Sequence, residues 1–226
     1  VGGTHSACFF INGHAEFSGG GKLTLTGRTK HAYASDEYTL LKASTGTIEV
    51  LSAVSDGLHI DQYFEMRGGQ VTIDGVGGDC IDVSCTKDAT DELNGQAFMS
   101  GGTLVMNVAA DDVKGIKTEN AFHLSGGTLQ ATVSGLGTKG ISTGTDLTID
   151  STSGSAPQLR MTVSGTTYMP GDATLESKCR GIKVKGNFTF DGGDINMTVT
   201  GAKAKGISID GTWTYVSGTT NVMPSL

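Results

Sequence analysis

The sequence has few prolines and aromatic residues, no long apolar run and no excess of positive charge. Only 3 of its 226 residues are proline and 6% are aromatic. No apolar run approaches the length of about 18 residues that predicts a membrane-spanning helix. The net charge of -7 argues against a nucleic-acid partner, because the chain has no overall cationic field to replace the counterions of a phosphate backbone.

Cysteine is also scarce, with four residues in the chain. They form no Cys-x-x-Cys pair and have no histidine at metal-ligand spacing, which argues against a zinc site. Cys80 and Cys85 are close enough in sequence to bridge. However, Cys8, Cys80 and Cys179 fall at or beside a recurring glycine position, so we predict small buried thiols.

What the sequence does contain is glycine, with 35 residues, in a 25-residue repeat. The stretch from Ser100 to Ile149 repeats Gly-Gly-Thr-Leu, an alternating apolar and polar run, and Lys-Gly-Ile. Its copies stay in step, since Gly102 and Gly127 are 25 residues apart, as are Gly115 and Gly140. A fixed period of this length indicates a repeat architecture.

Further copies of the Lys-Gly-Ile element extend over most of the chain. We align Lys30-His31-Ala32, Asp56-Gly57-Leu58, Asp79-Cys80-Ile81, Lys114-Gly115-Ile116, Lys139-Gly140-Ile141, Arg180-Gly181-Ile182 and Lys205-Gly206-Ile207. Two longer steps predict loop insertions near residues 85–94, 151–157 and 166–178.

Within each copy, apolar and polar residues alternate with a period of two, which predicts strands. Three short strands per copy cannot complete a sheet alone, so copies must stack. We therefore predict an all-β, single-domain right-handed parallel β-helix over residues 1–226, with about seven or eight coils. A leucine-rich-repeat horseshoe has a similar period but needs a leucine and asparagine pattern that is missing here. A β-sandwich would not explain the regular step.

Stacking would align the residue before each repeated glycine into one charged column. That column contains Lys30, Asp56, Asp79, Lys114, Lys139, Arg180 and Lys205. Its successive cations predict a site for a repeated anion. The alternative is that the lysines extend into solvent or pair with the aspartates.

Carboxylates concentrate in the first half of the chain, at Asp56, Asp61, Asp79 and Asp82. Short acidic side chains on neighbouring coils suit a hard cation such as calcium, which takes 6–8 oxygen ligands. The alternative is a set of solvated turn aspartates. Paired carboxylates are also what a glycosidase needs, so a polysaccharide lyase or hydrolase stays open. However, the Asn-Thr-Asp and Gly-His-Gly signatures of polygalacturonases are missing.

Several of these segments resemble one known family. They are Ser55-Asp56-Gly57-Leu58-His59-Ile60-Asp61, Gly78-Asp79-Cys80-Ile81-Asp82, Thr138-Lys139-Gly140-Ile141 and Ala204-Lys205-Gly206-Ile207. Together they resemble the non-catalytic carbohydrate-binding parallel β-helix proteins, whose architecture is similar to that of pectate lyases. The resemblance covers about residues 6–215. Ser55 and Gly78 stand where the family pattern has a further aspartate.

The resemblance implies calcium binding through Asp56, Asp61, Asp79 and Asp82, and affinity for acidic polysaccharide. It also implies a secreted or cell-surface location, behind a secretion or lipid-anchor signal that would precede Val1.

We accordingly expect a non-catalytic protein that binds a uronate-containing polysaccharide. The expected ligand-binding residues are Lys114, Lys139, Arg180, Lys205, Lys117, Lys183, Tyr33 and His59. A structural adhesin, in which the coils only display the inserted loops, is the second alternative to an enzyme.

Overall fold

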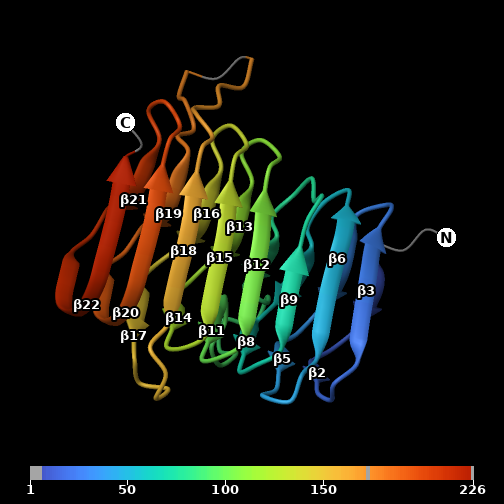
Figure 1. Cartoon of the computed structure of the whole chain (residues 1–226). Helices are drawn as coiled ribbons and strands as arrows, with labels where there is room; N and C mark the ends of the chain where they lie inside the picture. Colours follow the sequence, from blue (N-terminus) through green and yellow to red (C-terminus); the bar gives the residue numbers. More distant parts are fainter. Residues whose placement is uncertain (1–6, 172–173, 225–226) are drawn as a thin grey trace.

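The computed structural model describes residues 7–171 and 174–224, and in these residues the chain consists of strands, turns and loops (Figure 1). No helix in this part of the chain is long and apolar enough to cross a membrane. The strands form two sheets, and every pairing between named strands is parallel.

The first sheet has eight strands, one from each successive turn of the chain. In order they are β1 (Ala7–Ile11), β4 (His31–Ser35), β7 (Leu58–Asp61), β10 (Ile81–Ser84), β13 (Lys114–Thr118), β16 (Lys139–Thr143), β19 (Arg180–Val184) and β21 (Lys205–Ile209).

The second sheet has two rows of strands that the long strand β20 (Phe188–Val199) joins. One row is β2 (Ala15–Phe17), β5 (Thr39–Leu41), β8 (Tyr63–Met66), β11 (Gln96–Met99), β14 (Phe122–Leu124) and β17 (Leu147–Asp150). The other is β3 (Lys22–Gly27), β6 (Thr47–Ala53), β9 (Gln70–Ile73), β12 (Thr103–Val108), β15 (Thr128–Val133) and β18 (Gln158–Val163). Strand β22 (Trp213–Pro224) pairs with β20.

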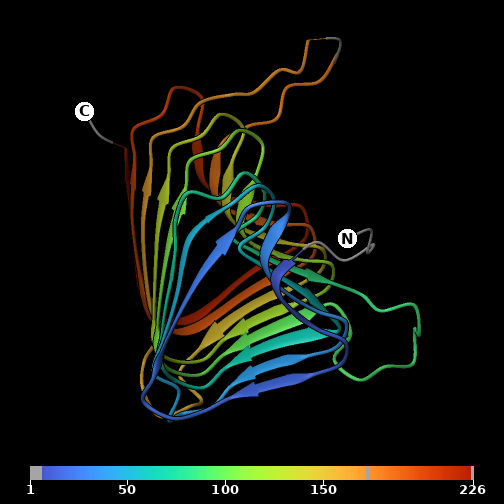
Figure 2. The ribbon, with the colours of Figure 1, turned by 90° about the vertical axis from the view of Figure 1, so that its right-hand side faces the viewer.

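Each turn of the chain visits the three rows in the same order, and each strand pairs with its counterpart in the next turn. The predicted all-β fold with parallel, stacked strands is therefore confirmed. Viewed along the stack, the turns lie behind one another (Figure 2), which is consistent with a solenoid. The right-handed, closed β-helix stays a prediction.

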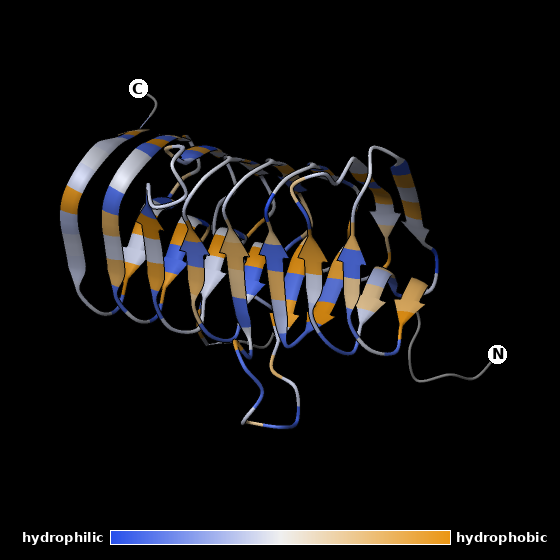
Figure 3. Cartoon of the chain, turned by 90° about the horizontal axis from the view of Figure 1, so that it is seen from below, coloured by the Kyte–Doolittle hydropathy of each residue, from blue (hydrophilic) through white to orange (hydrophobic). Residues whose placement is uncertain are grey.

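The hydrophobic core lies between the rows and extends from Ala15 to Met197 in one cluster. Buried and more exposed residues alternate along strands such as β12 and β15, because successive residues of a strand point to opposite faces. Figure 3 shows the matching alternation of hydrophobic and hydrophilic residues along the strands. The strand register places the aliphatic residue that follows each repeated glycine in an inner ladder. It stacks Leu58, Ile81, Ile116, Ile141, Ile182 and Ile207 on one another.

The repeated glycine of Lys-Gly-Ile allows neighbouring turns to approach closely. A Cβ added to Gly140 would lie 2.7 Å from the Gly181 carbonyl oxygen and 2.9 Å from Met161 Sδ. A Cβ on Gly115 would lie 2.4 Å from the Gly140 oxygen. A larger residue at Gly115 or Gly140 would force these turns apart. Cys80 and Cys179, at or beside the equivalent position, are buried and free, whereas Cys8 is exposed and Cys85 partly exposed.

The three stretches expected to be insertions connect strands. Residues 85–94 lie between β10 and β11, residues 151–157 between β17 and β18, and residues 166–178 between β18 and β19. In the last of these, Tyr168 and Ser177 form an isolated antiparallel bridge. Figure 2 shows the first and last of these loops, in green and orange, leaving the body of the stack.

Tyr33 lies inside the core and not on the surface. The register pairs Tyr33 with Leu58, so its ring occupies the inner position that a leucine or isoleucine occupies in later turns. Its side chain is 2% exposed and its hydroxyl hydrogen-bonds with Thr39 Oγ1 at 2.8 Å. This corrects the expectation that Tyr33 contacts a ligand.

Candidate functional site

The outer face of the first sheet carries two columns of polar side chains. In one column, Lys114 pairs with Lys139, Lys139 with Arg180, and Arg180 with Lys205. In the other column, His59 pairs with Asp82 and Asp82 with Lys117, and the column continues through Ser142 to Lys183. The parallel register thus aligns the cations of successive turns, as the spacing of the repeat predicts.

A groove of about 580 Å³ lies over the basic half of this face. It is lined by six cationic side chains and a single carboxylate, Glu119. The cations are Lys114, Lys117, Lys139, Arg180, Lys183 and Lys185. Like charges this close together repel one another, and an anion between them would relieve the repulsion. The groove is therefore a locally positive region on a protein of negative net charge.

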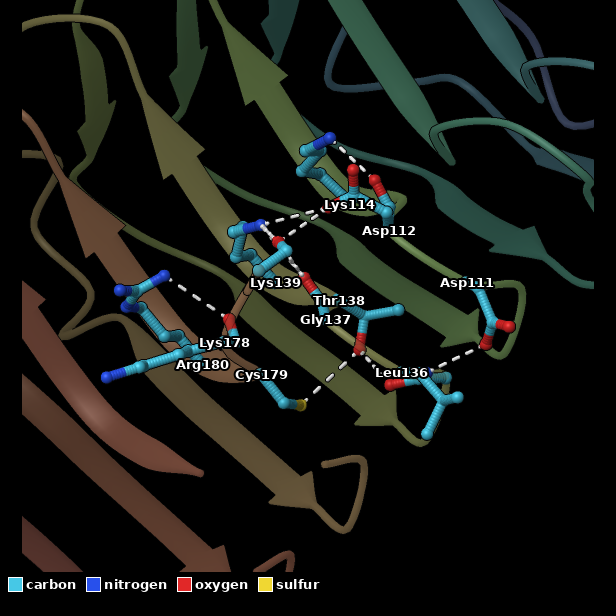
Figure 4. A network of polar contacts seen from close by, with 12 residues as sticks. Asp111, Asp112, Lys114, Leu136, Gly137, Thr138, Lys139, Lys178, Cys179 and Arg180 are labelled. Carbon is cyan, nitrogen blue, oxygen red and sulfur yellow. Dashed lines mark hydrogen bonds and ion pairs between the residues drawn. The ribbon is translucent and has the colours of Figure 1, made fainter. Parts of the chain in front are cut away.

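Lys139 is the anchored cation of the groove (Figure 4). Its side chain is 11% exposed, and its Nζ donates to the Gly137 carbonyl oxygen and to Ser177 Oγ, each at 2.8 Å. It also pairs with Asp112 Oδ1 at 3.3 Å. Burial lowers the pKa of Lys139, and the Asp112 charge partly offsets that effect. Lys139 therefore links its strand in the groove wall to the inserted loop that carries Ser177.

Arg180 is less completely satisfied than Lys139. Its guanidinium donates from Nη1 to the Lys178 carbonyl oxygen at 3.2 Å, whereas its Nε is buried without a hydrogen-bond partner among the described residues. An unpaired buried donor costs free energy. Arg180 thus lines the groove without a carboxylate partner among the described residues.

The remaining expected cations differ in their availability. Lys114 Nζ donates to the Asp112 carbonyl oxygen at 2.6 Å. Lys117 pairs with Asp82 at 2.9 Å, and Lys183 pairs with Asp210. Lys205 is exposed on β21, beside Arg180 but outside the residues that line the groove.

At the other end of the same face, histidines and aspartates of consecutive turns form a cluster. His31 Nδ1 lies 3.0 Å from Asp56 Oδ2. His59 Nδ1 lies 3.3 Å from the same oxygen and 3.1 Å from Asp82 Oδ2. The two imidazole rings stack with their centroids 4.4 Å apart. Asp61 lies at the edge, with its Oδ1 3.9 Å from His59 Nε2.

The surroundings of these side chains shift the pKa values of the titratable groups in and beside the cluster. The hydrogen bond with Asp56, and then that with Asp82, raises the pKa of His59 to about 9. Burial alone would raise the pKa of Asp56, but hydrogen bonds from His31, His59 and the Asp79 N–H outweigh it and lower that pKa. Burial raises the pKa of Asp79 to about 6. His59 is therefore cationic at neutral pH and is paired within the protein.

The four aspartates expected to bind calcium lie near one another but have nitrogen partners. Asp56 Oδ1 accepts the Asp79 N–H at 2.8 Å, and Asp79 Oδ1 accepts the Lys114 N–H at 2.7 Å. Asp82 faces His59 and Lys117. A calcium shell of 6–8 oxygens would require displacing these partners. Calcium binding stays a prediction.

His31 is a member of the cluster that the sequence alignment missed. Aligning Lys30 with Asp56 placed His31 at the glycine position, but the register pairs Ala34 with His59 and therefore sets His31 beside Asp56. The signal was available, because His31 and Asp56 are 25 residues apart, one full period of the repeat.

The described structure thus combines stacked parallel strands with a cationic groove on one face. A protein-family model matches residues 2–205, and the chain belongs to that family, which is described as carbohydrate-binding domain-containing protein. The chain is thus a member of a carbohydrate-binding family. Searches of curated proteins and of solved structures found no significant match.

Proposed function

We propose that this protein binds an acidic, uronate-containing polysaccharide in the groove over β13, β16 and β19, on the outer face of a right-handed parallel β-helix. The observation that carries the proposal is the groove itself, with six cationic side chains and one carboxylate in about 580 Å³. Carboxylates of a polyuronate would accept charge-assisted hydrogen bonds there, which are stronger than neutral ones.

The repeat of the fold supports a polymeric ligand over a small one. Successive turns place equivalent cations one inter-strand spacing apart, about 4.8 Å. A chain of uronates running along the stack would therefore meet a cation at each turn. Arg180 lines the groove, and its guanidinium donates to a carbonyl oxygen and to no carboxylate among the described residues, so its charge is available to such a chain.

The test is affinity electrophoresis and calorimetry with polygalacturonate as the probe. We expect Arg180→Gln to weaken binding about tenfold, because a hydrogen bond to a charged group contributes about 1.5 kcal/mol or more. Arg160→Gln is the matched control. Arg160 lies on β18 in the other sheet, where its Nη2 donates to Gln158 Oε1 at 2.6 Å.

Unchanged migration of the wild-type protein in polygalacturonate gels would contradict the proposal, as would equal losses in the two arginine variants. The same samples, monitored for unsaturated uronate absorbance and for reducing ends, test the enzyme alternative. Calcium assistance, expected from the resemblance, predicts tighter binding with added calcium than with chelator. The proposal extends to action in the secreted or cell-surface environment, where such polysaccharides are found.

A further inference from the structure

A second groove lies on the outer face of the second sheet. It has a volume of about 320 Å³ and crosses the neighbouring strands β12, β15, β18 and β20 (Figure 1). None of the residues that line it also lines the cationic groove on the first sheet. The two grooves are therefore separate surfaces of the molecule.

Two columns of polar side chains form the walls of the second groove. The strand register stacks Thr132, Thr162 and Thr198 in one column, and Gln130, Arg160 and Asn196 in the other. Ala131 and Met161, which lie between the columns on their strands, also line it. Equivalent residues of successive turns are one inter-strand spacing apart, about 4.8 Å. The groove therefore runs along the stack and offers similar groups at each turn.

The hydroxyl and amide groups of these walls are not used within the protein. Among the described residues, no side-chain hydrogen bond is made by Gln130, Thr132, Thr162, Asn196 or Thr198. A threonine hydroxyl can both donate and accept, and a side-chain amide has two N–H donors and an accepting oxygen. The second groove thus presents a row of free donors and acceptors.

The second groove also carries little charge. Arg160 is the only charged residue among those that line it, and its Nη2 donates to Gln158 Oε1 at 2.6 Å. The cationic groove, in contrast, is lined by six cations. A polymer with a charge on each unit would therefore find few counter-charges in the second groove, whereas a neutral polymer needs only the donors and acceptors.

We propose that the second groove binds a neutral, extended polysaccharide through the hydroxyls and amides of its two walls. Sugar hydroxyls both donate and accept, as the groups of the walls do. An extended chain of linked sugars can follow a straight groove and meet a similar wall at each turn. The chain belongs to a carbohydrate-binding family, which favours a sugar polymer over an extended peptide. This site goes beyond the acidic ligand proposed for the cationic groove and does not depend on it.

The experiment uses cellohexaose in a calorimeter and hydroxyethylcellulose in affinity gels, with the whole chain. We expect the wild type to bind both. Thr162→Val keeps the shape of the side chain but removes its hydroxyl, and it should weaken binding about fivefold, the usual effect of one hydrogen bond between uncharged groups. Thr148→Val is the matched control, because Thr148 lies on β17, outside the second groove. It should bind as the wild type does.

Two further measurements separate this site from the cationic groove. Raising the salt concentration should leave cellohexaose binding unchanged, because salt screens charges, and should weaken polygalacturonate binding. Arg180→Gln should bind cellohexaose like the wild type, and Thr162→Val should bind polygalacturonate like the wild type. Far-UV circular dichroism checks that Thr162→Val is folded, and Thr132→Val replaces it if it is not.

The proposal is overturned if the wild type neither binds cellohexaose nor is retarded by hydroxyethylcellulose. Equal losses in the groove variant and in Thr148→Val would also overturn it. So would cellohexaose binding that falls with salt or is lost in Arg180→Gln, because the neutral ligand would then occupy the cationic groove.

Discussion

Charged side chains in this protein are held both by residues close in sequence and by partners from neighbouring turns. Asp150 illustrates this. Its Oδ2 lies 2.8 Å from His123 Nε2, and its Oδ1 accepts hydrogen bonds from the N–H and hydroxyl of Thr152 at 3.1 and 2.6 Å. Burial would raise the pKa of Asp150, but the bonds from Thr152 and His123 outweigh it and lower that pKa.

Asp150→Asn should therefore lower stability in a pH-dependent way. A carboxyl whose pKa is lowered in the folded state stabilises above its unfolded pKa, and that contribution is lost as pH falls through the folded pKa. At pH 7 we expect the free energy of unfolding to fall by about 1 kcal/mol, the typical contribution of one hydrogen bond. The difference from wild type should shrink below about pH 4, the ordinary range of an aspartate.

Urea unfolding at several pH values between 7 and 3 measures this difference. Asp194→Asn is the control, because Asp194 lies on the same sheet and its side chain makes no hydrogen bond or ion pair in the described structure. A loss in Asp150→Asn that stays constant down to pH 3 would contradict the explanation.

Residue type and spacing predicted the basic column of the groove, but the availability of each charge could not be predicted. Lys139 and Lys114 occupy equivalent positions, yet the loop of residues 166–178 reaches only Lys139, through Ser177. Tyr33 and His31 were misplaced because the charge of Lys30 was aligned with that of Asp56, a step of 26 residues, whereas the strand register follows the regular step of 25 from His31 to Asp56. A one-residue shift moves a side chain to the opposite face of a strand.

Among the elements of the fold, the stacked strands depend on small residues where neighbouring turns come closest. We expect Gly140→Ala to lower the free energy of unfolding by about 1–3 kcal/mol, the usual range for overpacking. The added Cβ would lie 2.7 Å from the Gly181 carbonyl oxygen, and a backbone atom cannot move aside as a flexible side chain can.

Gly20→Ala provides the control for this substitution. Its Cβ would meet no heavy atom within 4 Å, and its backbone is not in the left-handed region, so stability should stay within about 0.5 kcal/mol of wild type. Urea midpoints of the two variants measure the comparison. Equal midpoints would show that the repeated glycine is dispensable at this position.

Periodicity predicted the strands and their pairing because each turn repeats the same inward and outward pattern. The length of β20 could not be predicted in this way. Gly192 and Gly193, both with positive φ, interrupt the alternation between Phe190 and Ile195. The strand nevertheless continues across them and joins the two rows. Local sequence marks a turn at this point, and pairing with β17, β18 and β22 overrides it.

For the whole molecule, the separation of charge along the stack matters more than the net charge. The carboxylates of the cluster come from β7, β10 and the turns before them, whereas the groove cations come from β13, β16, β19 and the residue that follows β19. The Asp82–Lys117 ion pair, 2.9 Å long, marks the boundary between the two regions. A net charge of -7 is therefore compatible with an anionic ligand, provided that the ligand binds locally.

The stack also predicts that stability varies along the molecule. In a repeat architecture each turn contacts only its neighbours, and β21 and β22 pair on one side only, with β19 and β20. Their side chains are correspondingly exposed: Trp213 is 40% exposed and Tyr215 is 54% exposed. The last turn should open at a lower free energy than the central ones.

Trp213 makes this prediction measurable because it is the single tryptophan of the chain. Its ring packs edge-on against Phe188, with centroids 4.6 Å apart, so opening of the last turn exposes it to water. We expect its fluorescence to change at a lower urea concentration than far-UV circular dichroism, which reports on all turns. Amides of β21 and β22 should exchange with solvent faster than those of β13 and β16. Coincident fluorescence and dichroism transitions, together with uniform exchange, would instead mean that the stack unfolds as one cooperative unit.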